Sequence, residues 1–275
     1  MTETKARGLI HLAFMSDVCE QSMSWCDKLG STPGIGYQLD WHALPSDILL
    51  NALSPLVDRM VSGDEQRFSF DVREALKLQF TSYDGFQFGF EPTKVFVGFT
   101  HRAEIHTGSG GIPSLGLRSK PSTFTALLDE IQGYLLNTME TINRLKGRRL
   151  AGIGIVTTTW AERADIPPGI KKLLMYASKP WEGRLQSLTF QAQSILDEND
   201  DYLHRCIHTI IKTLKEDEPI QVIFDYQRVY KKPQDIDPNR LRPATEAVTA
   251  SALDYFEQLA QGDRFDDVLG NADIR

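Results

Sequence analysis

The chain has 275 residues, of which 41% are hydrophobic and 24% are charged, and its formal net charge is -7. A chain of this size can bury a full hydrophobic core without disulfides or metals, and its composition excludes a disordered protein. No apolar run reaches the roughly 18 residues that a membrane-spanning helix needs, so we expect no membrane partner. The acidic balance argues against a nucleic acid partner, because phosphate binding needs a concentrated basic face.

The N-terminal segment and the cysteines indicate the compartment. Residues 9–15 form the most apolar N-terminal stretch, but His11 interrupts it and acidic residues follow, so it is too short and too polar for a signal-peptide core. The three cysteines, Cys19, Cys26 and Cys206, form no CxxC pair, which fits free thiols in a reducing compartment. We therefore expect a cytoplasmic protein, and no motif in the sequence calls for a cofactor.

The first sixty residues predict two helices. Apolar positions with loose helical spacing run through residues 8–29, and Gly30 then opens a loop over residues 31–36. A second helix is expected from Pro45 or Ser46 to about Val61, because its leucines fall on one face.

Residues 67–101 change to a period of two, which is typical of antiparallel strands. Asp84-Gly85 supplies a hairpin turn, and residues 91–94 supply the next one. Eight of the fourteen phenylalanines lie between positions 68 and 99, so this meander needs a large cover. The expected cover is an amphipathic helix over residues 122–146, with Ser122 as its N-cap and Gly147 just beyond its end.

The second half repeats this order of elements. Strands are expected over residues 152–160, 185–196 and 219–230, a short helix over 168–177, and a final helix over 244–261. Residues 202–214 are ambiguous, because their apolar positions have helical spacing while their β-branched content suits a strand. We favour a helix there.

Together these elements predict an α+β fold in which long amphipathic helices pack on antiparallel sheet in two sheet-then-helix passes. We expect residues 1–275 to form a single compact unit. A subdivision into 1–149 and 150–275 is the alternative, with the linker either in the Gly-rich segment 107–113 or near Leu150.

One candidate catalytic site lies at the end of the aromatic meander. His101, Glu104 and His106 could perform general acid/base chemistry beside a mobile loop, although a solvated strand end is the simpler explanation of these residues. Gly108, Gly110 and Gly111 follow and could aim backbone N–H groups at an anionic ligand. The loop lacks both the P-loop and the dinucleotide-binding patterns, so it also fits a flexible connection.

The candidate metal ligands are His204 and His208, which are four residues apart and would share one face of a helix. If the segment is a strand instead, Cys206 joins them on one face. No fourth ligand is identifiable, and histidines on a polar face are the alternative explanation.

A resemblance covers residues 120–270. A β segment followed by a proline-containing loop at residues 152–168, a strand with Phe224-Asp225-Tyr226, a polar loop and a helix closing on Phe265 resemble a sporadically distributed bacterial protein family of unknown function. The resemblance implies a bacterial, cytosolic accessory protein and transfers no catalytic residue.

Two functional hypotheses follow. The first is a non-enzymatic binding or assembly protein that acts through protein-protein contacts or self-association, because antiparallel strands offer free edges. The alternative is an enzyme or small-ligand-binding protein with its site near the Gly-rich segment 107–113.

Overall fold

The structure is a computed structural model. It describes residues 25–28, 31–40, 68–74, 77–82, 84–101, 103–107, 113–117, 122–141, 149–162, 164–179, 187–213 and 219–261. Antiparallel strands dominate these residues and helices pack beside them, so the expected α+β class is confirmed.

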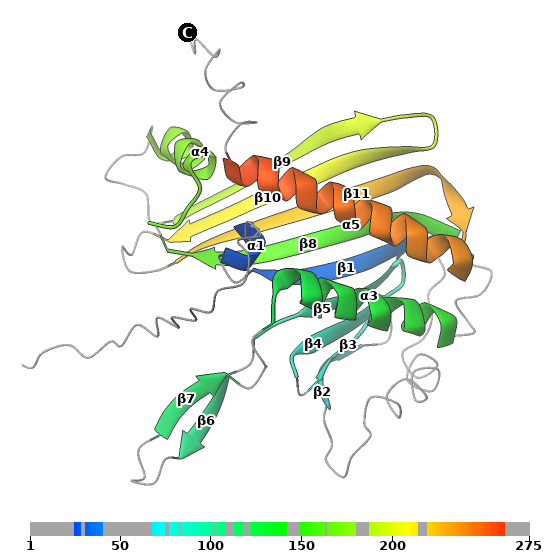
Figure 1. Ribbon diagram of the computed structural model, residues 1–275, viewed down its shortest axis with the longest axis horizontal. Coiled ribbons are helices and arrows are strands. Elements are labelled where there is room, and N and C mark those ends of the chain that lie inside the picture. Colours follow the sequence, from blue (N-terminus) through cyan, green and yellow to red (C-terminus); the bar gives the residue numbers. More distant parts are fainter. Residues whose placement is uncertain are drawn as a thin grey trace, which may run out of the picture.

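One antiparallel sheet of nine strands forms the body of the molecule, in the order β2-β3-β4-β5-β1-β8-β11-β10-β9. Strands from both halves of the chain belong to it (Figure 1). A separate two-stranded hairpin, β6 (Ala103–Thr107) and β7 (Pro113–Leu117), lies before the first long helix.

The two halves meet at β1 (Thr32–Leu39) and β8 (Arg149–Ala161), which pair antiparallel with Ile35 opposite Ile155. On its other side, each of these strands pairs with the last sheet strand of its own half, β5 or β11. The remaining strands of each half continue outward as a meander, and a helix follows each half. Both halves therefore follow the order central strand, outer meander and helix on either side of the β1/β8 pair, with four meander strands in the first half and three in the second.

The loop expected over residues 31–36 is wrong, because these residues begin the central strand β1. Ser31-Thr32-Pro33-Gly34-Ile35-Gly36 carries loop-forming residue types, but alternate positions point to opposite faces of the sheet. Ile35, Tyr37 and Leu39 are at most 3% exposed beneath the helices. Burial of these side chains overrides the low strand preference of the glycines and the proline.

The meander of the first half is confirmed. It consists of β2 (Phe68–Glu74), β3 (Lys77–Ser82), β4 (Phe86–Glu91) and β5 (Lys94–Phe99). Gly85 has a φ of 102°, which is why this hairpin turn needs glycine. The helix α3 (Phe124–Thr141) then packs against β1 and β5, and α1 (Trp25–Lys28) lies beside it.

The second half continues from β8 through α4 (Pro168–Ser178), β9 (Ser187–Glu198), β10 (Tyr202–Thr213) and β11 (Ile220–Asp235) to α5 (Pro238–Gln261). The helix expected over residues 202–214 is wrong, since this segment is the strand β10. Its partners on both sides, β9 and β11, supply the ladder that its β-branched residues suit.

The last helix also begins earlier than expected. Pro238 opens α5, and the Asp237 side chain accepts a hydrogen bond from the Asn239 amide at 3.0 Å. A proline is tolerated in the first turn of a helix, so Pro238 can begin α5, whereas Pro243 lies inside the helix.

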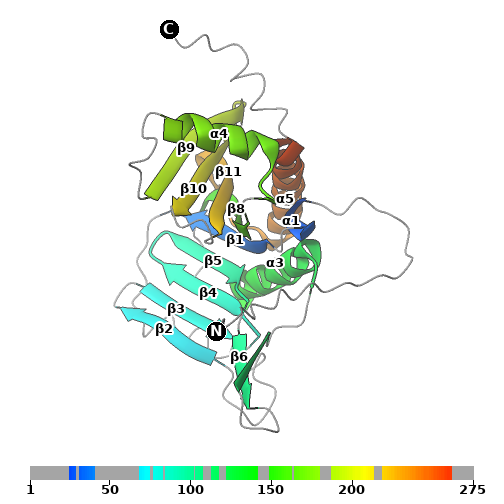
Figure 2. The same ribbon diagram turned by 90° about the vertical axis from the view of Figure 1, so that its left-hand side faces the viewer.

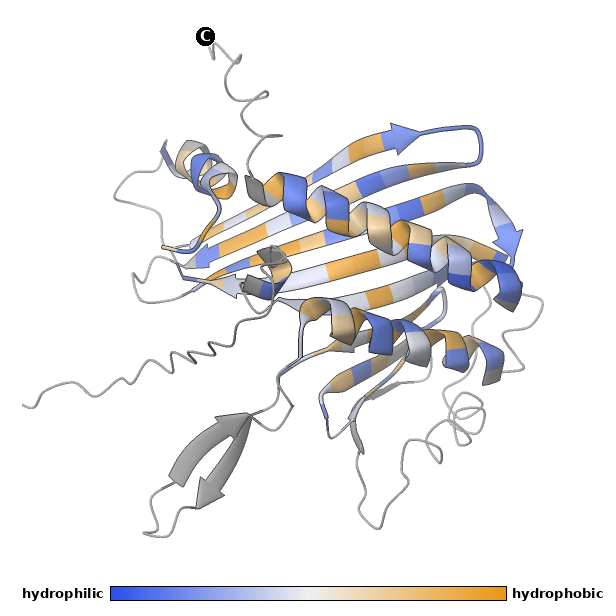
Figure 3. Cartoon of the chain, viewed as in Figure 1, coloured by the Kyte–Doolittle hydropathy of each residue, from blue (hydrophilic) through white to orange (hydrophobic). Residues whose placement is uncertain are grey.

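All the packing helices lie on one face of the sheet (Figure 2). Apolar and polar positions alternate along the strands beneath them (Figure 3). The core lies between this face and the helices, and its largest fully buried side chains include Tyr37, Phe88, Phe124, Phe224 and Phe256. The opposite face of the sheet, which we call the helix-free face, carries no helix among the described residues.

The helices expected over residues 8–29 and 45–61 fall largely or wholly outside the described residues, except that Trp25–Lys28 is helical. Of the described helices, none combines the length and the hydrophobicity needed to cross a membrane.

Candidate functional site

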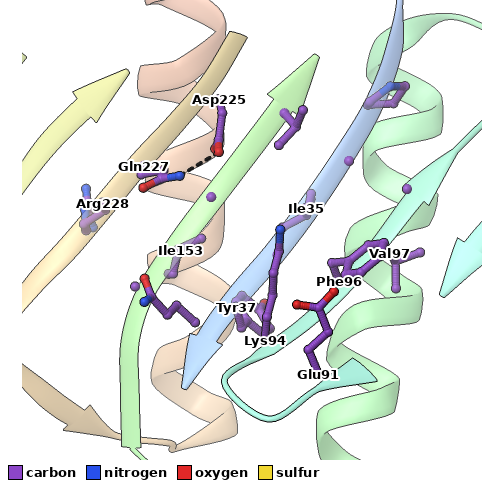
Figure 4. Close-up of a pocket in the computed structure, with 18 of the residues that line it drawn as sticks. Ile35, Tyr37, Glu91, Lys94, Phe96, Val97, Ile153, Asp225, Gln227 and Arg228 are labelled. Atoms are coloured by element: carbon purple, nitrogen blue, oxygen red, sulfur yellow. Dashed lines mark hydrogen bonds between the residues drawn. The ribbon is translucent and has the colours of Figure 1, made fainter. Parts of the chain in front are cut away.

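A groove of about 510 Å³ lies on the helix-free face, over the pair of central strands where the two halves meet (Figure 4). Its floor is formed by β1, β8 and the Gly98 position of β5. One wall comes from β5, and the other comes from β11 and β10. The groove thus lies at the junction of the two halves of the chain.

Glycines form the middle of the floor. Gly36 on β1 pairs with Gly154 on β8, and Gly34 on β1 pairs with Gly98 on β5. Gly152 on β8 lies opposite Gln38. Without side chains, these residues expose the flat surface of the peptide backbone.

The protein's own packing does not demand glycine at every one of these positions. A Cβ on Gly34 would meet nothing closer than 3.6 Å, and one on Gly98 nothing closer than 3.8 Å. Neither residue has a positive φ. Glycine within a strand is destabilising and often marks a place where a ligand or another backbone approaches closely. We infer that Gly34 and Gly98 keep the floor open for a bound molecule.

Gly152 is glycine for a different reason. A Cβ on Gly152 would lie 2.8 Å from the backbone oxygen of Arg228, which is too close for a real contact. The fold therefore requires glycine at this end of the floor, whether or not a ligand binds.

A chain of hydrogen bonds organises the β11 wall. Arg205 donates through Nε to Gln227 Oε1 at 2.8 Å, and Gln227 donates through Nε2 to Asp225 Oδ2 at 2.6 Å. The other carboxylate oxygen, Oδ1, lies toward β8, where a Cβ on Gly154 would come within 3.4 Å of it. The three side chains therefore hold one another in place, with Asp225 Oδ1 directed over the glycine floor.

The environment of Asp225 disfavours its charge. Burial raises the pKa of the carboxyl above its ordinary value, while the Gln227 hydrogen bond and the positive charges of Lys94 and Arg205 oppose this change. A ligand that donates a hydrogen bond to Oδ1 would stabilise the ionised form.

The β5 wall is aromatic and cationic. The Lys94 ammonium lies 5.2 Å from the centre of the Phe96 ring, and the ring in turn occupies the space above Gly89. Nearby, Glu91 forms an ion pair with Lys77 at 3.3 Å. The wall thus presents a flat apolar surface beside a positive charge.

The dimensions follow from sheet geometry. Thr32 and Gln38 mark the ends of the floor on β1, which makes the floor about 20 Å long at roughly 3.3 Å per residue. Three strand spacings of about 4.8 Å separate β5 from β11, so their backbones are roughly 14 Å apart. Inward-pointing side chains narrow this width.

The predicted catalytic residues lie elsewhere. His101 is exposed after β5, with its ring 5.2 Å from that of Phe99, and it does not line the groove. Glu104 and His106 lie on β6, at positions paired with Gly116 and Ser114. The anion-binding candidates Gly108, Gly110 and Gly111 lie outside the described residues.

The predicted metal ligands His204 and His208 share one face of β10 with Cys206, beneath the helices. His204 Nε2 accepts a hydrogen bond from Arg228 Nε at 2.9 Å, and His208 Nε2 is 2.9 Å from the Tyr255 hydroxyl. Within the described part of the chain, no group of three or more His, Cys, Asp or Glu side chains is arranged to hold a metal. The Nε2 atoms of His204 and His208 instead take part in the two hydrogen bonds just described.

Sequence reasoning missed the groove, although a signal was present. The pattern Gly-x-Gly occurs at Gly34 and Gly36 and again at Gly152 and Gly154, each time with an apolar residue between the glycines. On a strand this pattern places both glycines on one face and the apolar residue on the other. Recognising it required knowing that residues 31–36 form a strand.

Comparison of the chain with protein-family models, with curated proteins and with solved structures found no match.

Proposed function

We propose that this protein is a non-enzymatic binding and assembly protein that holds an extended polypeptide segment in the groove on its helix-free face. The observation that carries the proposal is the open floor at Gly34 and Gly98, flanked by a wall whose polar groups are already fixed by their own hydrogen bonds. Groups held in this way bind with a smaller loss of conformational entropy.

The shape of the groove supports an extended chain. A floor about 20 Å long accommodates roughly six residues of extended polypeptide. The volume of about 510 Å³ lies within the usual range of binding sites. The glycines let the bound chain approach the sheet closely, so that its side chains can contact Phe96 on one side.

The chemistry of the lining also supports a polypeptide. Gln38, Gln87 and Gln227 bring carboxamides to the groove, and each carboxamide can donate and accept as a peptide group does. Asp225 Oδ1 offers an acceptor for an N–H or ammonium group, and Lys94 offers a charge for a carboxylate. The chain's net charge of -7 does not favour a polyanionic ligand.

A bacterial accessory protein of the cytoplasm, as the resemblance of residues 120–270 implies, suits this role. The same proposal places the protein's partners among other polypeptides, including copies of itself.

A displayed library of random twelve-residue peptides tests the proposal. The library is selected against the full chain, and the enriched peptides are measured by fluorescence anisotropy against the full chain and two variants. Gly98→Val fills the floor of the groove. Gly133→Val makes the same chemical change on the exposed side of α3, where a Cβ would have no neighbour within 4 Å.

We expect enriched peptides to lose at least about tenfold in affinity for Gly98→Val, which is about 1.4 kcal/mol, and to keep their affinity for Gly133→Val. The thermal midpoints of both variants show whether the fold is intact. Equal binding to both variants would move the binding site away from the groove. If no peptide is enriched, the proposal that the ligand is a polypeptide is wrong.

A further inference from the structure

The two edge strands of the sheet differ in how they are protected. The sequence of β2 includes Asp71, Arg73 and Glu74, and its pairing with β3 shifts register after Phe70. Charges and irregular pairing keep an edge strand from pairing with another chain. At the opposite edge, β9 has twelve residues, and Ser187–Leu196 contains no charge, proline or glycine.

The edge at β9 is also regular. Its pairing with β10 runs without a shift from Ser187 to Ile195, and the register changes only beyond that point. In an antiparallel ladder, alternate residues direct their N–H and C=O groups away from the neighbouring strand. No strand in the described part of the chain pairs with the outer side of β9. Beside these groups, the Ile195 side chain is 63% exposed.

We propose that β9 pairs antiparallel with β9 of a second copy of this chain, about a two-fold axis at Ala192, so that the two sheets become one. This inference rests on the edge strand and is independent of the groove. Symmetry restricts the register, because directly opposed residues must point to the same face of the sheet. Two residues that face one another must then both have odd numbers or both have even numbers. The two-fold axis therefore passes through one residue and not between two residues.

Placing the axis at Ala192 brings uncharged residues of the two copies opposite one another. On the helix side of the sheet, Phe190 faces Ser194 of the partner subunit, and Ala192 faces Ala192 of the partner subunit. On the helix-free face, Thr189 covers the exposed Ile195 of the partner subunit, and Gln191 meets Gln193 of the partner subunit. The regular pairing of β9 ends at Ile195, before Asp197 and Glu198, so no charged residue lies within the paired length. The strand is therefore complementary to itself over its uncharged length.

The pairing repeats a relation that already exists within the chain. The strands β1 and β8 join the two halves antiparallel in the same sense. Because the two-fold axis stands perpendicular to the sheet, the helices of both copies lie on one face and both grooves lie on the other. Dimerisation thus leaves the grooves open.

Sedimentation equilibrium of the full chain tests the dimer, and two double variants test its register. Gln191→Lys with Gln193→Lys places a lysine opposite a lysine of the partner subunit twice. Gln191→Lys with Gln193→Glu places a lysine opposite a glutamate of the partner subunit twice. The control, Gln221→Lys, adds a positive charge to the same face on the interior strand β11.

We expect the full chain to sediment at twice the chain mass. The double-lysine variant should weaken dimerisation at least about 100-fold, because like charges directly opposite one another are repulsive. The lysine-glutamate variant and Gln221→Lys should remain dimeric, with thermal midpoints showing that all variants are folded. A monomeric wild type, or a double-lysine variant that stays dimeric, would overturn the proposal. A monomeric lysine-glutamate variant would overturn the axis at Ala192.

Discussion

His208 Nε2 lies 2.9 Å from the hydroxyl of Tyr255, and this contact connects the strand β10 to the helix α5 inside the core. His204, four residues earlier on the same strand, accepts a hydrogen bond from Arg228. An Nε2 atom that accepts a hydrogen bond from a guanidinium is unprotonated, so His204 is neutral in the folded protein. Burial lowers the pKa of both histidines below the ordinary value.

The free energy of unfolding should therefore decrease as the pH falls below about 6.5, the ordinary pKa of histidine. Because the folded pKa values are lower than the unfolded ones, the unfolded chain binds more protons in this range, and stability increases with pH. Urea unfolding at pH 7.5, 6.5 and 5.5 measures the slope. Replacing both histidines by glutamine, which keeps an uncharged acceptor, should flatten it. An unchanged slope in that double variant would assign the pH dependence to other groups.

A second buried contact connects the central strand to the same helix. Tyr37 is fully buried, and its hydroxyl is 2.8 Å from Thr245 Oγ1. Thr245 itself donates to the Leu241 carbonyl, so the Tyr37 hydroxyl is the donor of this pair. We expect Tyr37→Phe to cost about 1 kcal/mol in unfolding free energy.

Thr245→Val should cost more, about 1–3 kcal/mol, because it leaves a buried hydroxyl donor unpaired. The double variant should cost less than the sum of the two single variants, since the pair is then removed as a unit. Denaturant titrations of the three variants provide the comparison, and strict additivity would mean that the two hydroxyls do not interact.

Substitutions of the glycines in the groove floor should differ in their effect on the free energy of unfolding. We expect Gly98→Ala to leave the unfolding free energy unchanged or to raise it by up to about 1 kcal/mol, because alanine restricts the unfolded chain more than glycine does and the Cβ has room in the folded strand. Gly152→Ala should destabilise the protein by about 1–3 kcal/mol, because the Arg228 backbone oxygen cannot move aside. Thermal melts of the two variants decide this, and a destabilised Gly98→Ala would make that glycine structural.

Part of the fold can be predicted from the sequence, and the glycines of β1 show where such prediction fails. The period of two in residues 67–101 and the periodicity of α3 identify their elements, because each such segment buries one face. In β1 the buried face is equally regular at Ile35, Tyr37 and Leu39, but glycines and a proline on alternate positions obscure it. Local residue preference therefore predicts a loop in a segment where the tertiary environment imposes a central strand.

The candidate site was unpredictable for a related reason. Its polar residues come from both halves of the chain, with Lys94 on β5 and Arg205 and Asp225 on the consecutive strands β10 and β11, and only the strand order brings the two halves to one groove. The segment 202–214 could not be assigned to a strand without its neighbours, so Arg205 could not be placed on any face. The candidate sites predicted from the sequence consist of histidines and closely spaced glycines, because these residue types suggest chemistry. The groove is instead built from ordinary residues in a particular strand register.

Asp225 should reduce stability at neutral pH, as expected of a residue kept for binding. Its folded pKa is raised, chiefly by burial, so the folded chain binds more protons than the unfolded chain between the two pKa values. The carboxyl then favours folding most at low pH, and this contribution is lost as the pH rises through the folded pKa. Asp225→Asn carries no such charge and can still accept the Gln227 hydrogen bond.

The difference in unfolding free energy between Asp225→Asn and the wild type should therefore shift in favour of asparagine as the pH rises from 4 to 7. Urea titrations across this range measure the difference, and the peptides selected on the wild type provide the functional readout. We expect the asparagine variant to be at least as stable as the wild type at pH 7 and to bind those peptides more weakly, because its amide replaces the acceptor over the floor. If asparagine instead loses stability as the pH rises, the Asp225 charge supports the fold, and the residue is structural.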